Sequence, residues 1–502
     1  MATGVRDLAA GISLANLCYL RLWAELFVIS ERGRYFVKAG PQEILAAILS
    51  VVVLGLLFAS GAQLARRASA ARIPARVAFL FVLFLLLSNL GRDKEPGLLY
   101  LVALVREEDF LRAVALSALA LAGSAAVLVW RDRFFRAAPT VLLALSPFVV
   151  VTFGRAASDA WTLSRSGHIP EGDAPVPGSA PAAPDGPAVV LMIFDGMGRR
   201  MAFENRPKGV RMPSFDRLRA ESVEARDVVA VNTATARVLP ALLSGVIPLK
   251  TKADGASDLR LTLAGGREVL WSETDTLFDE ALRLGGRASV VGWYHPYCRV
   301  FDGLSECAWY SSTTGHGRIA ETSIFSAAYA EIAALDPYTV HRVRQIRSWR
   351  ALLDGGKRVV STRGRGFVLV HLNIPHSPPI WNAARQRASA YRFDPRHYAD
   401  SLEQADAALA ELRAAMETAG TWETSTVIVT ADHPSKEAAK AFGVAEDTIP
   451  LFVKLPGQKT GATQEKRLSA AFTYELAKWL LAEPVTDPAA VVAWLDAPPV
   501  KQ

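Results

Sequence analysis

The sequence predicts a two-part protein, with an N-terminal domain of five transmembrane helices and a C-terminal α/β domain whose mostly parallel sheet lies between helices. Three observations support this prediction. Apolar residues crowd into the first third of the 502-residue chain, a Pro- and Gly-rich segment follows, and short β-branched runs then alternate with segments of helical period. The predicted parts are a membrane domain at 1–154, a flexible linker at 155–187 and an exported domain at 188–495.

The composition excludes several classes of protein. Hydrophobic residues make up 51% of the chain and charged residues 21%, and the mean hydropathy is +0.20, which excludes a disordered or collagen-like chain. Three cysteines are too few for a disulfide-dense secreted scaffold. The net charge of +7 comes largely from the loops between the apolar segments, so we do not expect nucleic-acid binding.

Five apolar segments have the length of a membrane span. A spanning helix needs about 20 predominantly apolar residues, and a cleaved signal peptide does not account for five such segments. The third segment is short and begins just after Pro74. The predicted spans are 8–29, 44–64, 75–91, 113–130 and 137–153.

Loop charges set the orientation of these spans, because cytoplasmic loops carry an excess of Lys and Arg. The loop after the second span carries Arg66, Arg67, Arg72 and Arg76, and the loop after the fourth is also basic. This pattern places the N-terminus in the cytoplasm and the chain after the fifth span outside. The loop 31–38 is mildly basic and weakly favours the opposite orientation.

The exported part reads as alternating strands and helices, which is typical of a parallel sheet covered on both faces. In such sheets the ligand site lies outside the carboxyl ends of the strands. The predicted strands are 188–194, 288–293, 367–372, 426–430 and 449–455, and the predicted helices are 214–222, 276–284 and 401–419.

Polar side chains follow these strands at the positions where a site is expected. Two carboxylates, several imidazoles and a hydroxyl suit a hard or borderline divalent cation. Each residue alone is weak evidence for a site, because an Asp after a strand is often a helix cap or a turn residue. Their convergence from separate strands predicts a metal site. The residues are Asp195, Thr235, His295, His371, His376, Asp432 and His433.

Five stretches carry a resemblance to a known family. They are 212–218 (MPSFDRL), 233–245 (TATARVLPALLSG), 293–298 (WYHPYC), 371–378 (HLNIPHSP) and 430–433 (TADH). With these stretches the chain resembles the alkaline phosphatase superfamily. Within it, the chain looks most like the membrane-bound phosphoethanolamine and phosphoglycerol transferases that are related to lipoteichoic acid synthases. The resemblance extends over nearly the whole chain and implies an alkaline-phosphatase-like, sulfatase-like exported domain.

The resemblance implies a nucleophile and its ligands. In these transferases the nucleophile is a threonine five residues before a proline, which is Thr235; Thr233 is the rival in the same stretch. The implied ligands of one divalent metal are Asp195, Thr235, Asp432 and His433, with zinc favoured over manganese or magnesium. Coordination to a dication would activate the hydroxyl, which is otherwise a poor nucleophile.

Further residues are predicted to bind the substrate. The resemblance implies that His376 touches the substrate phosphate, and His295 is a second candidate donor. The family has a later substrate histidine, but no histidine follows His433, so Arg237 or Lys436 is the candidate for the missing positive charge.

The chain also departs from the transferase pattern. Asp195 stands where the transferases usually have Glu, and Asp at this position is commoner in the phosphodiesterases and sulfatases of the superfamily. Pro434 stands where the transferases usually have Gly. A sulfatase needs a Cys or Ser that matures to formylglycine, which Thr235 cannot supply. The additional ligands of two-metal phosphatases are not evident, so we expect a single metal.

The predicted function is metal-dependent transfer of a phospholipid head group through a phospho-threonine intermediate. The implied donor is phosphatidylethanolamine or phosphatidylglycerol, and the implied acceptor is an envelope lipid or glycan. The implied location is a bacterial inner (cytoplasmic) membrane, crossed several times, with the catalytic domain in the periplasm or outside the cell. A phosphodiester hydrolase on the same fold and a catalytically silent membrane scaffold are the alternatives.

Cys298 and Cys307 are nine residues apart in the exported domain. An oxidising compartment permits a disulfide between them. The related transferases carry a cysteine just after a similar Trp-containing strand, so the resemblance implies that the two are paired. A pair of free buried thiols is the alternative.

Overall fold

The computed structural model describes most of the chain as two compact units. The described residues are 3–20, 23, 35, 41–90, 131–165, 172–173, 185–255, 257–311, 337–389 and 394–498. The first unit comprises Met1–Ser30, Ala39–His168 and Gly315–Val340, and the second comprises Glu31–Lys38, Ile169–Thr314 and His341–Gln502. We refer to the second as the catalytic unit.

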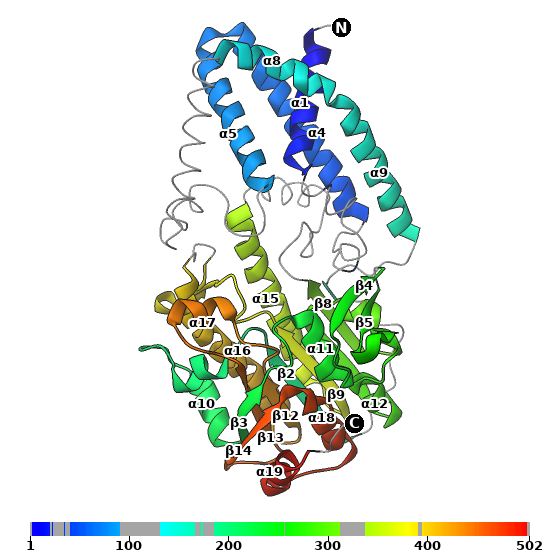
Figure 1. Ribbon diagram of the computed structural model, residues 1–502, viewed down its shortest axis with the longest axis vertical. Helices are drawn as coiled ribbons and strands as arrows, with labels where there is room; N and C mark the ends of the chain where they lie inside the picture. The colour runs from blue at the N-terminus through cyan, green and yellow to red at the C-terminus, as the bar shows by residue number, and fades with distance from the viewer. Residues whose placement is uncertain are drawn as a thin grey trace. The chain divides into compact units, whose positions relative to one another are not determined.

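The described part of the first unit is helical (Figure 1). Two of its helices approach closely at a pair of glycines, because a Cβ on Gly11 would lie 2.4 Å from the carbonyl oxygen of Gly55. Such small residues let helix backbones touch, as in membrane bundles. The helices are α1 (Thr3–Cys18), α4 (Pro41–Arg67), η1 (Ser69–Ala71), α5 (Arg72–Leu90), α8 (Arg131–Ala144) and α9 (Ser146–Arg165).

One helix among the described residues, Ile44–Arg67 within α4, is by itself long and apolar enough to cross a membrane, and a bent pair of helices passes the same test when taken together. Span 44–64 therefore coincides with α4, and span 75–91 falls on α5. Span 113–130 lies outside the described residues, and span 8–29 is described only in part. The structure thus supports a helical N-terminal unit, while five spans remain a prediction.

The segment predicted as the fifth span, 137–153, is not one straight helix. It is divided between α8 and α9, which meet at Leu145 with a bend of 41°. Pro147 explains the break, because proline lacks an N–H donor and disfavours helical geometry in the residue before it. Helix α9 then continues to Arg165, into the region predicted as linker.

The catalytic unit is built on a nine-stranded sheet in the order β1-β8-β7-β9-β2-β12-β13-β3-β14. Its central pairs β7–β9, β9–β2 and β2–β12 are parallel, whereas β13 is antiparallel to both of its neighbours. The strands are β1 (Gly172–Asp173), β2 (Ala188–Phe194), β3 (Val223–Val229), β7 (Arg287–Tyr294), β8 (Glu306–Ser311), β9 (Gly366–Leu372), β12 (Thr426–Thr430), β13 (Thr448–Lys454) and β14 (Ala462–Ser469).

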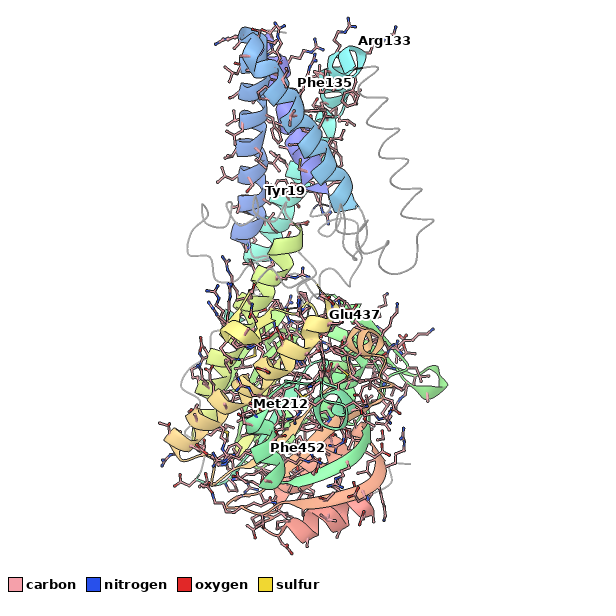
Figure 2. All side chains as sticks on the ribbon, turned by 90° about the vertical axis from the view of Figure 1, so that its left-hand side faces the viewer. Tyr19, Arg133, Phe135, Met212, Glu437 and Phe452 are labelled. Carbon is pink, nitrogen blue, oxygen red and sulfur yellow. A yellow bond between two sulfur atoms is a disulfide. The ribbon has the colours of Figure 1, made fainter. Side chains whose placement is uncertain are left out.

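Helices cover both faces of this sheet (Figure 1). The central strands are fully buried, as their near-continuous apolar sequences require. Figure 2 shows the buried side chains of Met212 and Phe452 within this packing. The helices are α10 (Pro213–Ala220), η2 (Arg200–Glu204), α11 (Thr235–Ser244), α12 (Leu277–Arg283), α13 (Tyr297–Val300), α15 (Pro337–Ser361), α16 (Tyr398–Ala419), α17 (Lys436–Phe442), α18 (Thr473–Ala482) and α19 (Pro488–Asp496).

The mostly parallel α/β architecture predicted from the sequence is confirmed. The strands predicted at 188–194 and 426–430 are β2 and β12, and the helix predicted at 401–419 lies within α16. Two small sheets have no counterpart among the predicted strands. They are the sheet of β4 (Lys250–Asp254), β5 (Asp258–Thr262) and β6 (Glu268–Leu270) and the pair of short strands β10 (Trp381–Asn382) and β11 (Arg387–Ala388). Within the predicted linker, β1 pairs with β8 at the sheet edge.

A disulfide joins Cys298 to Cys307, with Cα atoms 5.7 Å apart. It connects α13 to β8, the strand that runs parallel to β7. The bridge therefore fastens the turn after β7, which carries His295, to the neighbouring strand. Cys18 is the free cysteine of the chain and is buried.

Candidate active site

Neighbouring strands bring the acidic candidates to one edge of the sheet. In the parallel register, Ile193 of β2 lies beside Thr430 of β12 and beside His371 of β9. Asp195 follows the end of β2, and Asp432 follows the end of β12, so both carboxylates emerge at the same level. Helix α11 begins at Thr235 and presents this hydroxyl to them.

The hydroxyl of Thr235 lies at the centre of the group. Its Oγ1 is 2.8 Å from Asp432 Oδ2 and 3.2 Å from both Asp195 Oδ2 and His433 Nε2. A single hydroxyl proton can be donated to only one carboxylate at a time. Four candidate metal-ligand atoms from three separate parts of the chain therefore face one another. Thr233, the rival nucleophile, has an exposed side chain instead.

The second carboxylate is fixed by backbone groups. The N–H groups of Gly196 and His433 donate to Asp432 Oδ1 at 3.1 and 2.7 Å, which leaves Oδ2 directed at Thr235. Gly196 adopts φ +78°, a conformation that a side chain would oppose, and this turns its N–H toward Asp432. The tyrosine of α16, Tyr398, donates to the carbonyl of Gly196 at 2.8 Å and holds the same loop.

His433 has the tautomer that a metal ligand requires. Its Nδ1 lies 3.1 Å from the carbonyl oxygen of Pro434, which can only accept a hydrogen bond, so Nδ1 carries the proton. In the neutral imidazole Nε2 is then left with a lone pair directed at Thr235. The proline that departs from the family pattern thus still supplies the carbonyl that orients the imidazole.

Burial and the neighbouring charges shift the pKa values of the candidate ligands in different directions. Although burial disfavours its charge, the imidazoles of His376, His371 and His433 lower the pKa of Asp195 to about 2. Burial, followed by the nearby carboxylate of Asp195, raises the pKa of Asp432. Burial disfavours the charged form of His433, but the two carboxylates outweigh it and raise the pKa of this imidazole.

These residues fit a divalent cation. One ligand atom from each of Asp195, Asp432 and His433 lies within 4.8 Å of the other two, and all three residues are buried. Asp195 Oδ1 is buried without a hydrogen-bond partner among the described residues, although His376 Nε2 is 3.9 Å away. Two carboxylates and one imidazole suit zinc or manganese. With Thr235 they form the set that would hold the metal.

A buried histidine supports Asp195 from behind. The Nε2 of His371 lies 3.3 Å from Asp195 Oδ2, and its Nδ1 lies 3.1 Å from the hydroxyl of Tyr297. The tyrosine reaches this position because Gly292 has no side chain; a Cβ there would lie 2.3 Å from its ring. His371, which the sequence analysis lists among the residues that converge on the metal site, is therefore a support of the first ligand.

His376 lies at the entrance of the site. Its side chain is 35% exposed, its ring is centred 4.9 Å from the ring of Trp293, and its Nε2 points toward Asp195. The ring of His433 is centred 6.4 Å away. This imidazole therefore borders both the candidate ligands and solvent.

The other predicted substrate residues lie in different surroundings. His295 is fully buried, and burial together with the charge of His371 lowers its pKa to about 3. The guanidinium of Arg237 donates to the carbonyl of Leu249 at 3.3 Å. Lys436 is exposed at the start of α17, and its charge acts on His433. Of these three groups, only Lys436 is an exposed cation that acts on a ligand.

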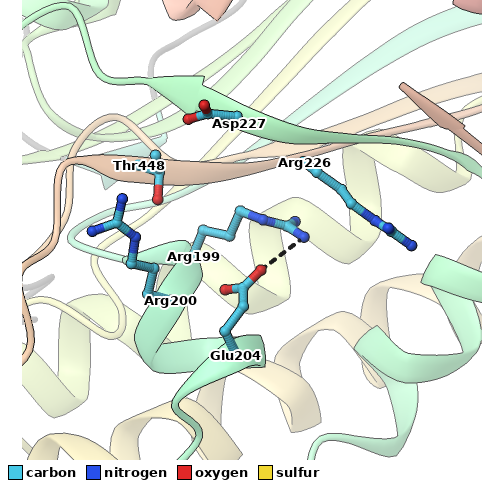
Figure 3. Close-up of a pocket in the computed structure, with 6 residues that line it drawn as sticks. All are labelled: Arg199, Arg200, Glu204, Arg226, Asp227 and Thr448. Atoms are coloured by element: carbon cyan, nitrogen blue, oxygen red, sulfur yellow. Dashed lines mark ion pairs between the residues drawn. The ribbon is translucent and has the colours of Figure 1, made fainter. Parts of the chain in front are cut away.

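A second hollow in the catalytic unit contains none of the predicted site residues (Figure 3). Buried Arg199 pairs there with Glu204 at 3.0 Å and with Glu224 at 2.8 Å. Cations and carboxylates alternate around the hollow, so the arrangement is an ion-pair network within the fold. The lining residues are Arg199, Arg200, Glu204, Arg226, Asp227 and Thr448.

Comparisons with known proteins identify the fold family. The sequence model of the family described as Sulfatase matches residues 187–481. No curated protein sequence matches the chain. Solved structures with similar folds include Ps i-CgsB in complex with k-i-k-neocarrahexaose, with 14% identity, coverage of 62% of this chain and 76% of that chain, and a TM-score of 0.44.

Two further solved structures have folds similar to that of this chain. The phosphonate monoester hydrolase of Agrobacterium radiobacter has 13% identity, coverage of 59% of this chain and 74% of that chain, and a TM-score of 0.38. A protein in the alkaline phosphatase superfamily from Vibrio parahaemolyticus has 14% identity, coverage of 62% and 72%, and a TM-score of 0.37.

Proposed function

This chain belongs to the sulfatase family, within the alkaline phosphatase superfamily, and from that premise we propose that it is a metal-dependent phosphotransferase. The proposed reaction transfers the phosphoethanolamine or phosphoglycerol head group of a membrane phospholipid. The acceptor is a hydroxyl of an envelope lipid or glycan. The observation that carries the proposal is the hydroxyl of Thr235, held between Asp195, Asp432 and His433.

A threonine at this position favours phosphoryl transfer over sulfate-ester hydrolysis. Formylglycine is made from Cys or Ser, and Thr235 is neither. When bound, a divalent cation would lower the pKa of the hydroxyl and neutralise charge on a phosphoryl oxygen. Asp432 Oδ2, at 2.8 Å, fixes the direction of the hydroxyl hydrogen.

The proposed reaction has two displacements. Thr235 Oγ1 first gives its proton to Asp432 Oδ2 and forms a bond to the phosphorus of the donor, the bond from phosphorus to the diacylglycerol oxygen breaks, and that oxygen takes up a proton from His376. The acceptor hydroxyl then attacks the phospho-threonine and passes its proton to His376, the bond from phosphorus to Thr235 Oγ1 breaks, and Oγ1 regains its proton from Asp432. His376, half-exposed and next to the ligands, is positioned to donate to the leaving oxygen.

The N-terminal unit would keep the enzyme beside its lipid donor. Helix α4 is apolar and ends in Arg66 and Arg67, which fits an orientation with this end in the cytoplasm. We propose a multi-pass protein of a bacterial inner membrane with the catalytic unit on the outer side. Tethering of this kind raises the local concentration of donor and enzyme without any new contact.

Trapping of the intermediate tests the proposal. Incubation of zinc-loaded full-length protein with phosphatidylethanolamine or phosphatidylglycerol should add the head-group phosphate to a peptide containing Thr235. Thr235→Ala should abolish the adduct and lower turnover by at least 10³-fold, whereas Thr233→Ala should retain both. Adduct on Thr233, or full activity of Thr235→Ala, would show that the nucleophile is wrong. Release of free head-group phosphate with acceptor present would identify a hydrolase.

A further inference from the structure

One buried residue of the catalytic unit comes from an unexpected part of the sequence. Tyr35 lies between α1 and α4 of the first unit along the chain, yet it is fully buried in the hydrophobic core of the catalytic unit. Its hydroxyl is 2.9 Å from His295 Nδ1, and Arg299 donates to its carbonyl oxygen at 2.7 Å. The side chain and the backbone of Tyr35 therefore both form hydrogen bonds with residues that follow β7.

The partner of Tyr35 lies in a strained turn. Tyr294, immediately before His295, has φ +76°, which is unfavourable for a residue with a large side chain. The turn closes with a hydrogen bond from the N–H of Tyr297 to the carbonyl of His295 at 2.9 Å. Strain of this kind persists only where surrounding contacts fix the conformation, and the disulfide at Cys298 is one of them.

His295 connects this turn to a support of the first ligand. Its ring is centred 4.8 Å from the ring of Trp271 and 5.8 Å from that of Tyr297. Tyr297 in turn contacts His371, the support of Asp195. One chain of contacts thus leads from the residue bound by Tyr35 to the active site.

We propose that Tyr35 is a positioning residue of the active site, whose hydroxyl fixes the ring of His295 against Tyr297, the tyrosine that contacts His371. On this inference the catalytic unit is complete only with a residue from the N-terminal third of the chain. The role of His295 is then positional, which fits its complete burial. The inference rests on the proposed role of Thr235, but it can be tested without turnover.

The inference also bears on the orientation in the membrane. Because Tyr35 is buried in the catalytic unit, the chain just before α4 must lie on the same side of the membrane as that unit. If α4 crosses, its Arg66–Arg67 end lies on the opposite side, as the loop charges predict.

Hydrogen exchange of the full-length protein in detergent tests the proposal. Tyr35→Phe removes only the hydroxyl, Tyr35→Ala also removes the ring, and Tyr474→Phe changes a buried tyrosine of α18 as a matched control. We expect a peptide covering 293–298 to exchange about threefold faster in Tyr35→Phe and at least tenfold faster in Tyr35→Ala. Tyr474→Phe should leave this peptide unchanged.

Zinc affinity supplies a second readout, since supports of metal ligands typically contribute about 10- to 100-fold. Competition with a chromophoric chelator should show weaker zinc binding in Tyr35→Ala, with Tyr35→Phe between it and the wild type. Unchanged exchange at 293–298 in both Tyr35 variants, or a uniform increase over the whole unit, would overturn the proposal. If Tyr35→Ala does not fold, exchange at 293–298 in Tyr35→Phe alone decides whether the proposal holds. Failure to trap an adduct on Thr235 would overturn the proposed function but leave this result standing.

Discussion

The contact between His371 and Asp195 gives the sharpest prediction about the metal site. His371 is fully buried, its Nε2 is 3.3 Å from Asp195 Oδ2, and Tyr297 fixes its other nitrogen at 3.1 Å. His371→Ala removes the donor that orients the first carboxylate. Loss of such an outer partner typically weakens metal binding about 10- to 100-fold, which is about 1.4 to 2.8 kcal/mol.

The assay is equilibrium competition for zinc between the protein and a chromophoric chelator at pH 7.5. His371→Gln provides the matched control, because the amide of glutamine retains an N–H donor in a side chain of similar reach. We expect His371→Gln to bind zinc within about fivefold of the wild type, well above His371→Ala. Equal affinity in His371→Ala and the wild type would refute the reasoning. Equal losses in both variants would show that the ring acts through packing alone.

Four further predictions follow from particular contacts. The carboxylates outweigh burial and raise the pKa of His433 above its ordinary value of 6.5, so the charged imidazole stabilises the metal-free protein below about pH 6.5. This stabilisation is lost as pH rises through the raised pKa. Because zinc must displace the Nε2 proton of His433, chelator competition should show weaker zinc binding at pH 6 than at pH 8. Replacing Cys298 and Cys307 with serine should cost roughly 2 to 3 kcal/mol in urea unfolding, and reductant should then have no further effect. Glu224→Gln removes the buried carboxylate that pairs with buried Arg199, leaves the more exposed Glu204 as its partner, and should cost about 3 to 5 kcal/mol in the same assay, whereas Glu465→Gln, at an exposed pair, should change stability by less than about 0.5 kcal/mol. In intact spheroplasts an impermeant thiol reagent should label Lys250→Cys but not Ser69→Cys, both in a Cys18→Ala background; equal labelling of both would contradict the orientation of α4.

The centre of the catalytic unit could be predicted because its strands are buried on both faces. Such strands have continuous apolar sequences, and these identified β2, β9 and β12 with their polar ends at Asp195, His371 and Asp432. Because parallel strands end at the same edge, the position of a residue after its strand was enough to place the carboxylates together. Thr235 was found through its stretch of sequence rather than its strand.

The rest depends on contacts that have no local pattern. Tyr35 is far from His295 in sequence, and nothing around it distinguishes a tyrosine of a loop from one bound in another unit. No local pattern places Tyr297 beside His371, and the tyrosine reaches this histidine because Gly292 has no side chain. The antiparallel position of β13 was also hidden, since its apolar run matches that of a parallel strand.

The electrostatics of the site explain why a cation would be part of its stability. Asp195 and Asp432 are both fully buried beside one hydroxyl, and the pKa of the first is lowered while that of the second is raised. For the first carboxylate burial is outweighed by the neighbouring imidazoles, which favour its charge, whereas burial and the charge of the first disfavour the charge of the second. A bound dication would supply the compensating charge. Its binding should therefore release protons and stabilise the folded catalytic unit, by about 2.7 kcal/mol at a free metal concentration 100 times the Kd.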